Sequence, residues 1–140
     1  LLDLSEDVTK RKAEIKSESL PVIHGDRVKI RQVLQNLIQN ALKFSAEDKQ
    51  AVITVSAEDL PREWKISVAD NGIGIKEEFY LQIFKPFQRL HRKRDLPGMG
   101  MGLAICKKIV ELFGGQITVR SVMGQGSTFS FTIPKPPQGG

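Results

Sequence analysis

The stretch RQVLQNLIQNALKF, residues 31–44, carries the clearest periodic signal in the chain. Apolar side chains recur here every three or four residues, which is the pattern of an amphipathic helix with one face in a core. Together with Ile30, which directly precedes the stretch, these apolar residues are Val33, Leu34, Leu37, Ile38, Ala41 and Leu42. Asp26 precedes the run and is a favourable N-cap residue. We therefore expect a long helix that follows Asp26 and packs one face into a core.

Three polar residues of this helix lie off its apolar face. Asn36, Asn40 and Lys43 are spaced i, i+4 and i+7, so they share one stripe. Amide oxygens can ligate a hard cation such as Mg²⁺, and a lysine attracts phosphate as a point charge. The alternative is that the two asparagines are ordinary surface amides on a solvated helix face. The stripe alone leaves both interpretations open.

The rest of the chain mixes strand-like and helix-like segments. Apolar and polar residues alternate, as in half-buried strands, over residues 52–57, 64–69, 116–122 and 128–133. Residues 13–23 are expected to form one or two edge strands. We expect a short helix over residues 77–84 and a long one over residues 100–113, ended by Gly114 and Gly115. The elements follow no regular βαβ order, which favours an α/β (α+β) sandwich with one sheet covered by helices.

Glycines gather in three clusters along the chain. They are DNGIGI at residues 70–75, GMGMGL at 98–103 and GQGS at 124–127. Glycine permits positive φ and lets main-chain N–H groups come close to a ligand. The second cluster opens the helix expected from residue 100, and a helix N-terminus favours anions such as phosphate. A flexible linker that binds nothing is the alternative, whereas Rossmann and Walker loops do not match these spacings.

Asp70 ends a predicted strand and begins the first glycine cluster. A carboxylate there can accept a hydrogen bond from an exocyclic amine such as that of adenine. Guanine would present a carbonyl oxygen instead, and a buried unpaired acceptor costs about 1–3 kcal/mol, which favours adenine. Alternatively, Asp70 only caps the turn at Asn71 and Gly72. The residue alone does not decide between these two roles.

Composition and charge narrow the class of protein. The 140 residues are 40% hydrophobic and 26% charged, which is ordinary for a globular domain. No apolar run approaches the roughly 20 residues of a membrane span, and the single cysteine, Cys106, excludes an internal disulfide. The net charge of +5 arises from residues 85–94, which hold five basic residues and no acidic one. That segment either binds phosphate or nucleic acid or is a solvated loop.

In their order along the chain, these motifs resemble the sequence boxes of sensor histidine kinase catalytic domains, which are members of the GHKL superfamily. The N, G1, F, G2 and G3 boxes correspond to residues 31–44, 70–75, 83–90, 98–103 and 124–127. The likeness covers about residues 26–134, nearly the whole chain. It implies a Bergerat-type mixed sheet with helices packed on one face and an ATP lid, which would begin in the basic segment of residues 85–94.

The resemblance also assigns roles to the matching residues. The metal position is Asn40, which would bind Mg²⁺, and the catalytic positions are Asn36, Lys43 and Arg89. The positions that would contact ATP are Asn40, Lys43, Phe44, Asp70, Gly72, Gly74, Ile75, Arg89, Gly98, Gly100, Gly102, Leu103 and Ser127. Among these, the resemblance gives Asp70 the adenine amine, Phe44 a place near the purine and Ser127 a place in the adenine pocket.

One position departs from the wider superfamily. DNA gyrase B and mismatch-repair ATPases, which resemble this fold, place a Glu four residues before the metal-binding Asn as general base for water. Here that position is Asn36, whose amide cannot usefully take up a proton. The resemblance therefore implies slow hydrolysis and transfer of the γ-phosphoryl group to an acceptor other than water.

The family's phosphoryl acceptor is a histidine in an upstream helical dimerisation domain, and no match to it is found here. The two histidines, His24 and His91, are expected to be ordinary surface residues. The expected partners are that upstream dimerisation domain and a downstream response regulator, with no nucleic acid and no direct membrane contact. We expect a cytoplasmic fragment of a longer protein, a monomer that binds ATP and Mg²⁺ without autophosphorylating alone.

The expected organisation has three parts: the end of a preceding helix or linker over residues 1–12, the catalytic ATP-binding domain over residues 13–134, and a C-terminal tail over residues 135–140. Two other functions stay open. A degenerate kinase-like module would bind nucleotide, or nothing, and serve as an interaction surface. A basic nucleic-acid-binding domain would lose affinity steeply with salt and would not prefer ATP to GTP.

Overall fold

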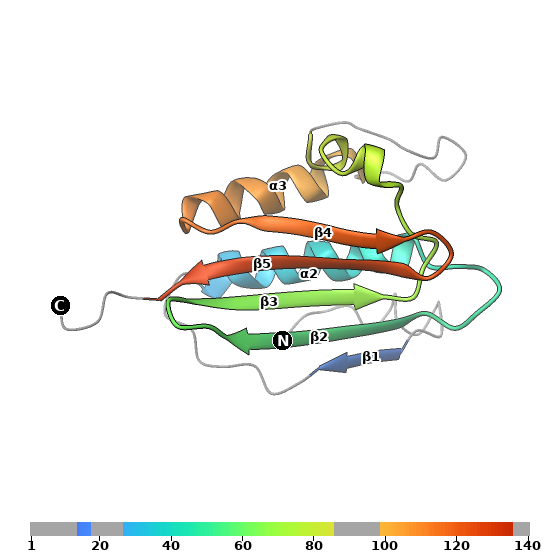
Figure 1. The fold of residues 1–140 in the computed structure, drawn as a ribbon, viewed down its shortest axis with the longest axis horizontal. Helices are drawn as coiled ribbons and strands as arrows, with labels where there is room; N and C mark the ends of the chain where they lie inside the picture. The colour runs from blue at the N-terminus through green and yellow to red at the C-terminus, as the bar shows by residue number, and fades with distance from the viewer. Residues whose placement is uncertain (1–13, 18–26, 86–98, 136–140) are drawn as a thin grey trace.

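The computed structural model describes residues 14–17, 27–85 and 99–135 of the chain. In chain order these residues form β1 (Glu14–Ser17), α2 (Arg27–Lys43), β2 (Val52–Asp59), β3 (Glu63–Asp70), the 3₁₀ turns η1 (Glu77–Phe79) and η2 (Gln82–Phe84), α3 (Met99–Leu112), β4 (Ile117–Val122) and β5 (Gly126–Pro134) (Figure 1). Several predicted features lie outside the described residues: the segment over residues 1–12, the N-cap Asp26, and nearly all of the lid and the tail.

The described strands form one mixed sheet in the order β1-β2-β3-β5-β4. β1 runs parallel to β2, and the other neighbouring strands are antiparallel. The last strand, β5, inserts between β3 and β4, with Ala69 opposite Thr128 and Ser121 opposite Ser127. The start of β5 therefore lies beside the end of β3, which brings the third glycine cluster to the first (Figure 1).

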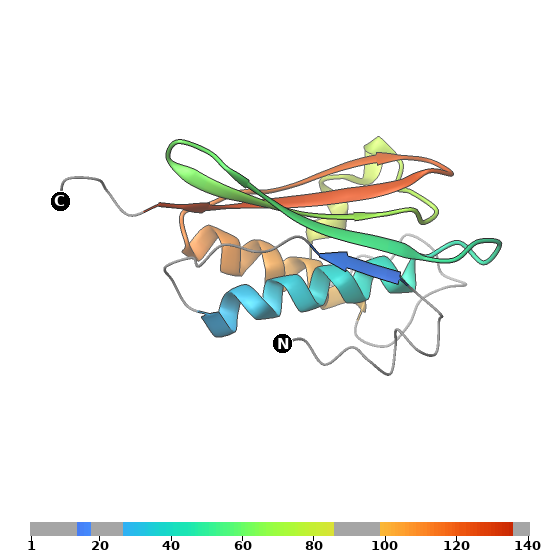
Figure 2. The same cartoon turned by 90° about the horizontal axis from the view of Figure 1, so that it is seen from below.

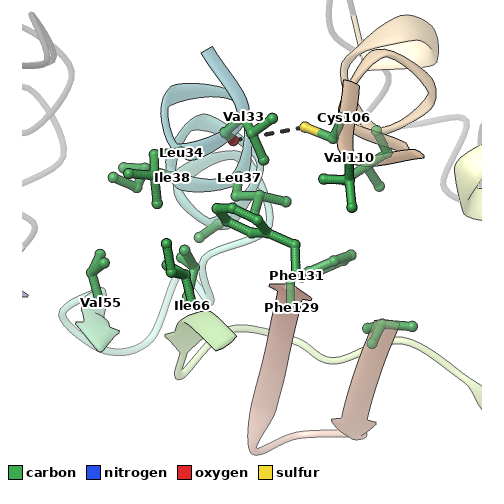
Figure 3. Close-up of a cluster of buried hydrophobic side chains, with 14 of the residues drawn as sticks. Val33, Leu34, Leu37, Ile38, Val55, Ile66, Cys106, Val110, Phe129 and Phe131 are labelled. Carbon is green, nitrogen blue, oxygen red and sulfur yellow. Dashed lines mark hydrogen bonds between the residues drawn. The ribbon is translucent and has the colours of Figure 1, made fainter. Parts of the chain in front are cut away.

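Both long helices cover the same face of the sheet, as Figure 2 shows. The helix α2 buries most of its predicted apolar stripe, namely Val33, Leu34, Leu37, Ile38, Ala41 and Leu42. Ile66, Phe129 and Phe131 face the helices from the sheet, and Phe131 is fully buried (Figure 3). Because side chains alternate along a strand, Ser67 and Ser130 point to the opposite face, where their hydroxyl oxygens lie 2.8 Å apart. The expected sheet with helices on one face is confirmed.

Gly114 and Gly115 end α3, as the sequence predicts. Gly114 has a φ of +83°, and its N–H donates to the Glu111 carbonyl at 2.9 Å. The N–H of Gly115 reaches back to the Val110 carbonyl at 3.0 Å, which completes a Schellman motif. A Cβ at Gly115 would lie 1.9 Å from the carbonyl oxygen of Thr132 in β5. The second glycine is therefore required by the close packing of the helix end on the sheet.

One local prediction needs correction. The helix expected over residues 77–84 is instead a pair of 3₁₀ turns, and Lys85 leaves the second turn in an extended conformation. Lys85 precedes a proline in the sequence, and the residue before a proline disfavours helical geometry. Trp64 lies on the same face of β3 as Ile66 and Val68 but is less buried than they are, near the end of the sheet. There the ammonium group of Lys135 lies 4.8 Å over its ring and pairs with Asp59.

Candidate nucleotide-binding site

The predicted site residues come together at one end of the molecule, on the right in Figure 1. The helices α2 and α3 run in opposite directions, so the end of α2 and the start of α3 lie at the same end (Figures 1 and 2). The strand order adds the end of β3 and the start of β5. Four of the five sequence boxes thus contribute residues to this end, while Arg89 and Gly98 lie outside the described residues.

Asp70, the last residue of β3, is held through one of its two carboxylate oxygens. Oδ1 accepts hydrogen bonds from the N–H groups of Gly72 at 2.8 Å and Ser127 at 3.2 Å. Within the described part of the chain, no hydrogen bond to Oδ2 is found. Burial raises the pKa of the carboxyl group, and the two N–H groups and Lys49 oppose that rise. Asp70 therefore caps the glycine turn and still keeps one oxygen for a donor.

Asn71 explains how the chain leaves the sheet directly after Asp70. Its side-chain oxygen accepts from the N–H of Val52 at 2.8 Å, and its amide nitrogen donates to the carbonyl of Gln50 at 2.9 Å. The side chain thus takes the place of the next step of backbone pairing between β2 and β3. Sequence reasoning treated Asn71 only as a turn residue and missed this role.

Gly72 and Gly74 are needed for close approach to the protein's own backbone. A Cβ at Gly72 would lie 2.4 Å from the carbonyl oxygen of Phe44, which also accepts a hydrogen bond from Ile73 N–H at 3.1 Å. Gly74 has a φ of +84°, and a Cβ there would lie 2.6 Å from the Val122 carbonyl oxygen. The first glycine cluster therefore packs closely between the end of α2 and the β4–β5 turn. That these glycines also approach a purine stays a prediction.

Two residues that the sequence analysis did not select, Ser121 and Tyr80, connect the first glycine cluster to β4 and β5. Ser121 Oγ lies 2.7 Å from Ser127 Oγ and accepts a hydrogen bond from Ile75 N–H, also at 2.7 Å. The Tyr80 hydroxyl accepts from the N–H of Ser121 at 2.8 Å and donates to its carbonyl at 3.1 Å. The helix-facing position of Ser121 in its strand was visible in the alternation of residues 117–122. Its contacts with Ile75 and Tyr80 join residues 46 and 41 positions away, which no local pattern predicts.

The polar stripe of α2 lies half-buried, between the solvated and core faces of the helix. The side chain of Asn36 lies near the thiol of Cys106 in α3 and lowers the pKa of that thiol. Burial outweighs this effect and raises the pKa of Cys106 to about 12, and the thiol also lies 3.7 Å from the Val33 carbonyl (Figure 3). Asn40 and Lys43 follow along the helix, and Lys43 lies in its last turn. A cation is favourable there because helix carbonyls point out of that end.

The start of α3 is the remaining part of the site. Gly100 and Gly102 lie in its first turns, since the helix begins at Met99. Among the residues that the structure describes, no atom lies within 4 Å of a Cβ placed at Gly102. Leu103 instead is buried in the core at 8% exposure, and Ile75 is buried to the same extent. Their side chains fix the two glycine segments in the fold.

No cluster of three His, Cys, Asp or Glu side chains that could hold a metal ion occurs among the residues that the structure describes. A divalent cation near Asn40 would therefore take most of its ligands from phosphate oxygens and water, which is the usual coordination of Mg²⁺ with nucleotides. The amide oxygen of Asn40 fits such an ion.

A model of the family described as histidine kinase-, DNA gyrase B-, and HSP90-like ATPases matches residues 25–137. The chain belongs to this family. This ATPase domain is 46% identical over 134 residues to the phytochrome-like protein Cph1 of Synechocystis sp., a match that covers 96% of the chain and 18% of Cph1. It is 40% identical over 117 residues to the adaptive-response sensory kinase SasA of Crocosphaera subtropica, covering 84% of the chain and 30% of SasA. The chain thus spans less than a third of either relative.

Solved structures of histidine kinases share the fold. The mycobacterial sensor histidine kinase MprB matches with a TM-score of 0.81 at 25% identity, over 96% of this chain and 92% of that chain. Full-length ShkA in complex with AMPPNP matches with a TM-score of 0.78 at 30% identity, over 94% of this chain and 27% of ShkA. The histidine kinase ThkA, in complex with the response regulator protein TrrA, matches with a TM-score of 0.75 at 30% identity. The match covers 98% of this chain and 38% of the matched chain.

These likenesses confirm the expected family and fold: the domain is homologous to the catalytic domains of sensor histidine kinases. None of the helices in the described part of the chain has the length and hydropathy that crossing a lipid bilayer requires.

Proposed function

We propose that the chain is the ATP-binding catalytic domain of a sensor histidine kinase that transfers the γ-phosphoryl group of ATP to a histidine on a separate dimerisation domain. The observation that carries the proposal is Asp70, a largely buried carboxylate with one oxygen fixed by two backbone N–H groups. The likeness of the domain to histidine kinase structures, one of them in complex with AMPPNP, supports the same function.

Asp70 would recognise adenine through Oδ2. Because the N–H groups of Gly72 and Ser127 hold Oδ1, the second oxygen is the one available to accept from the 6-amino group. A guanine base would set its carbonyl oxygen against this carboxylate. The discrimination is expected to be worth about 1–3 kcal/mol, the cost of a buried acceptor without a donor.

The phosphates would lie between the end of α2 and the start of α3. The first N–H groups of α3 have no partner within the helix and favour an anion. No described residue lies within 4 Å of a Cβ placed at Gly102, beside these groups. Lys43 would attract the phosphates from the last turn of α2. Arg89 and Gly98, from the predicted lid and its end, would complete the phosphate contacts.

Asn40 would ligate Mg²⁺ together with phosphate oxygens, with Asn36 in support. Slow hydrolysis is expected because the amide of Asn36 cannot usefully take up a proton from water. ATP would supply the phosphoryl group, and the residues of the site would hold and orient it.

The acceptor histidine would come from an upstream dimerisation domain, and the phosphoryl group would then pass to a response regulator. The related ThkA, solved in complex with the response regulator protein TrrA, supports this order of partners. We expect the domain to act in the cytoplasm and to be a monomer on its own. Incubation of the chain alone with labelled ATP should then leave no phosphohistidine on it.

Isothermal calorimetry with ATP and Mg²⁺ tests the proposal directly. Asp70→Ala should abolish the binding heat, whereas Asp59→Ala should not, because Asp59 lies at the far end of the sheet and pairs with Lys135. At about 100 times Kd, ATP should stabilise the unmodified chain by about 2.7 kcal/mol, which thermal denaturation detects. No heat with the folded, unmodified chain would refute nucleotide binding and favour a degenerate module.

The metal position is tested by titrating ATP with and without Mg²⁺. Asn40→Ala should remove the dependence of ATP affinity on Mg²⁺, and Gln32→Ala, an exposed change on the same helix, should keep it. If the Mg²⁺ dependence persists in the Asn40 variant, the ion is held elsewhere.

A further inference from the structure

Ser121 is the most connected side chain at the wall of the site. Its hydroxyl oxygen accepts from the N–H of Ile75 at 2.7 Å, donates to the carbonyl of Gly126 at 2.9 Å and lies 2.7 Å from Ser127 Oγ. The two hydrogen bonds with the Tyr80 hydroxyl hold its backbone on the outer edge of β4. Every one of these partners is fixed by the fold, so the Ser121 hydroxyl has one orientation.

Three of the residues form a row across neighbouring strands on the helix-facing side of the sheet. Ser121 of β4 is opposite Ser127 of β5. One step beyond the pair Ala69–Thr128, Ser127 lies beside Asp70 of β3, and its N–H donates to Asp70 Oδ1. Side chains directly opposite in such a row have Cβ atoms about 4.5–5.5 Å apart. Ser127 is therefore the link between Ser121 and the carboxylate that would bind the base.

The hydrogen count fixes the direction of the Ser121–Ser127 bond. A serine hydroxyl carries one hydrogen, and Ser121 gives that hydrogen to the carbonyl oxygen of Gly126, which can only accept. In the bond between the two serines, Ser127 must therefore be the donor and Ser121 the acceptor. The Ser127 oxygen is left with acceptor capacity only, next to a carboxylate that also only accepts.

We propose that Ser121 is a positioning residue for base selection, because it holds the Ser127 hydroxyl as an acceptor beside the Asp70 carboxylate. This inference rests on the proposed function. Two neighbouring acceptors match the 6-amino group of adenine, which carries two N–H donors. They oppose a base with a carbonyl oxygen at that position, since a Ser127 hydroxyl already committed to Ser121 cannot turn to donate to it.

The test compares the affinities of the chain for ATP and for inosine triphosphate, which carries a carbonyl oxygen where ATP has the 6-amino group. Ser121→Ala frees the Ser127 hydroxyl to rotate and donate, so the ratio of the two affinities should fall about fivefold to tenfold. Ser121→Thr keeps a hydroxyl and should restore the ratio. Ser121→Cys, a change of small volume to a weaker hydrogen-bonding group, should show the same fall if the alanine variant does not fold.

The matched control is Ser67→Ala, which breaks the Ser67–Ser130 hydroxyl pair on the opposite face of the same sheet. It removes one hydroxyl–hydroxyl contact away from the site, so any loss of stability that it causes should leave the affinity ratio unchanged. A Ser121 variant that weakens both nucleotides equally has only a structural effect and would overturn the inference while leaving ATP binding in place. Absence of ATP binding by the unmodified chain would overturn the proposed function, and this inference with it.

Discussion

Gly124 in the β4–β5 turn and Gly126, the first residue of β5, offer a direct test of how closely the start of β5 packs against the end of β3. Both have positive φ, +81° at Gly124 and +129° at Gly126. A Cβ at Gly124 would meet nothing within 4 Å, whereas one at Gly126 would lie 2.0 Å from the carbonyl oxygen of Asp70. The same substitution, Gly→Ala, therefore adds backbone strain at both sites and a steric collision at Gly126 alone.

The collision at Gly126 has no inexpensive relief. The three nearest atoms all belong to the backbone of Asp70 and Asn71, at 2.0, 2.8 and 2.9 Å. Strain at an unfavourable φ costs about 1–3 kcal/mol, and forcing extra volume into a packed region costs about 1–3 kcal/mol more. We expect Gly126→Ala to lower the free energy of unfolding by about 2–6 kcal/mol. Gly124→Ala should lower it by no more than about 2 kcal/mol.

Urea denaturation and thermal melting followed by circular dichroism measure the difference. At about 4 °C per kcal/mol for a domain of this size, Gly126→Ala should lower Tm by about 8–24 °C. Because the displaced residue is Asp70, that variant should also lose ATP affinity, while Gly124→Ala should keep it. Equal stability of Gly124→Ala and Gly126→Ala would refute the close contact between the start of β5 and the end of β3.

Three further predictions concern the core and the buried titratable groups. Phe131→Ala should lower the free energy of unfolding by about 3–5 kcal/mol, since Phe131 is 0% exposed; a loss below about 1 kcal/mol in urea melts would contradict its central place. Cys106 is 0% exposed and its pKa is raised to about 12, so its thiol should resist iodoacetamide at pH 8 until urea unfolds the chain. Rapid labelling of the folded chain, detected by mass spectrometry, would be inconsistent with that burial. Burial raises the pKa of Asp70 above 3.8, so the folded state binds the proton more tightly than the unfolded state. As the pH falls from above the folded-state pKa of Asp70 to below its unfolded-state pKa, the stability of the chain relative to Asp70→Asn should therefore rise. ATP affinity should weaken over the same interval. The opposite trend in pH-dependent melts would show that folding lowers the pKa of Asp70.

The sequence by itself determined the elements whose signals are local. The spacing of apolar residues in α2 and the alternation Phe129, Phe131, Ile133 in β5 predicted which side of each element is buried, because helix and strand periods fix side-chain direction. The glycine pair after α3 predicted its end, since positive φ at Gly114 is a local requirement. The order of five short motifs was enough to indicate the family.

Only the tertiary structure decided how the wall of the site is built. The strand order β3-β5-β4 brings Ser127 to Asp70 and Ser121 to Ser127, and Tyr80 reaches Ser121 from 41 residues away. No periodicity encodes such contacts, because strand partners and register are set by the packing of the whole sheet against α2 and α3. For the same reason only the structure shows that Asp70 caps the turn through Oδ1, which accepts from Gly72 and Ser127; its role as an acceptor for a base stays a prediction.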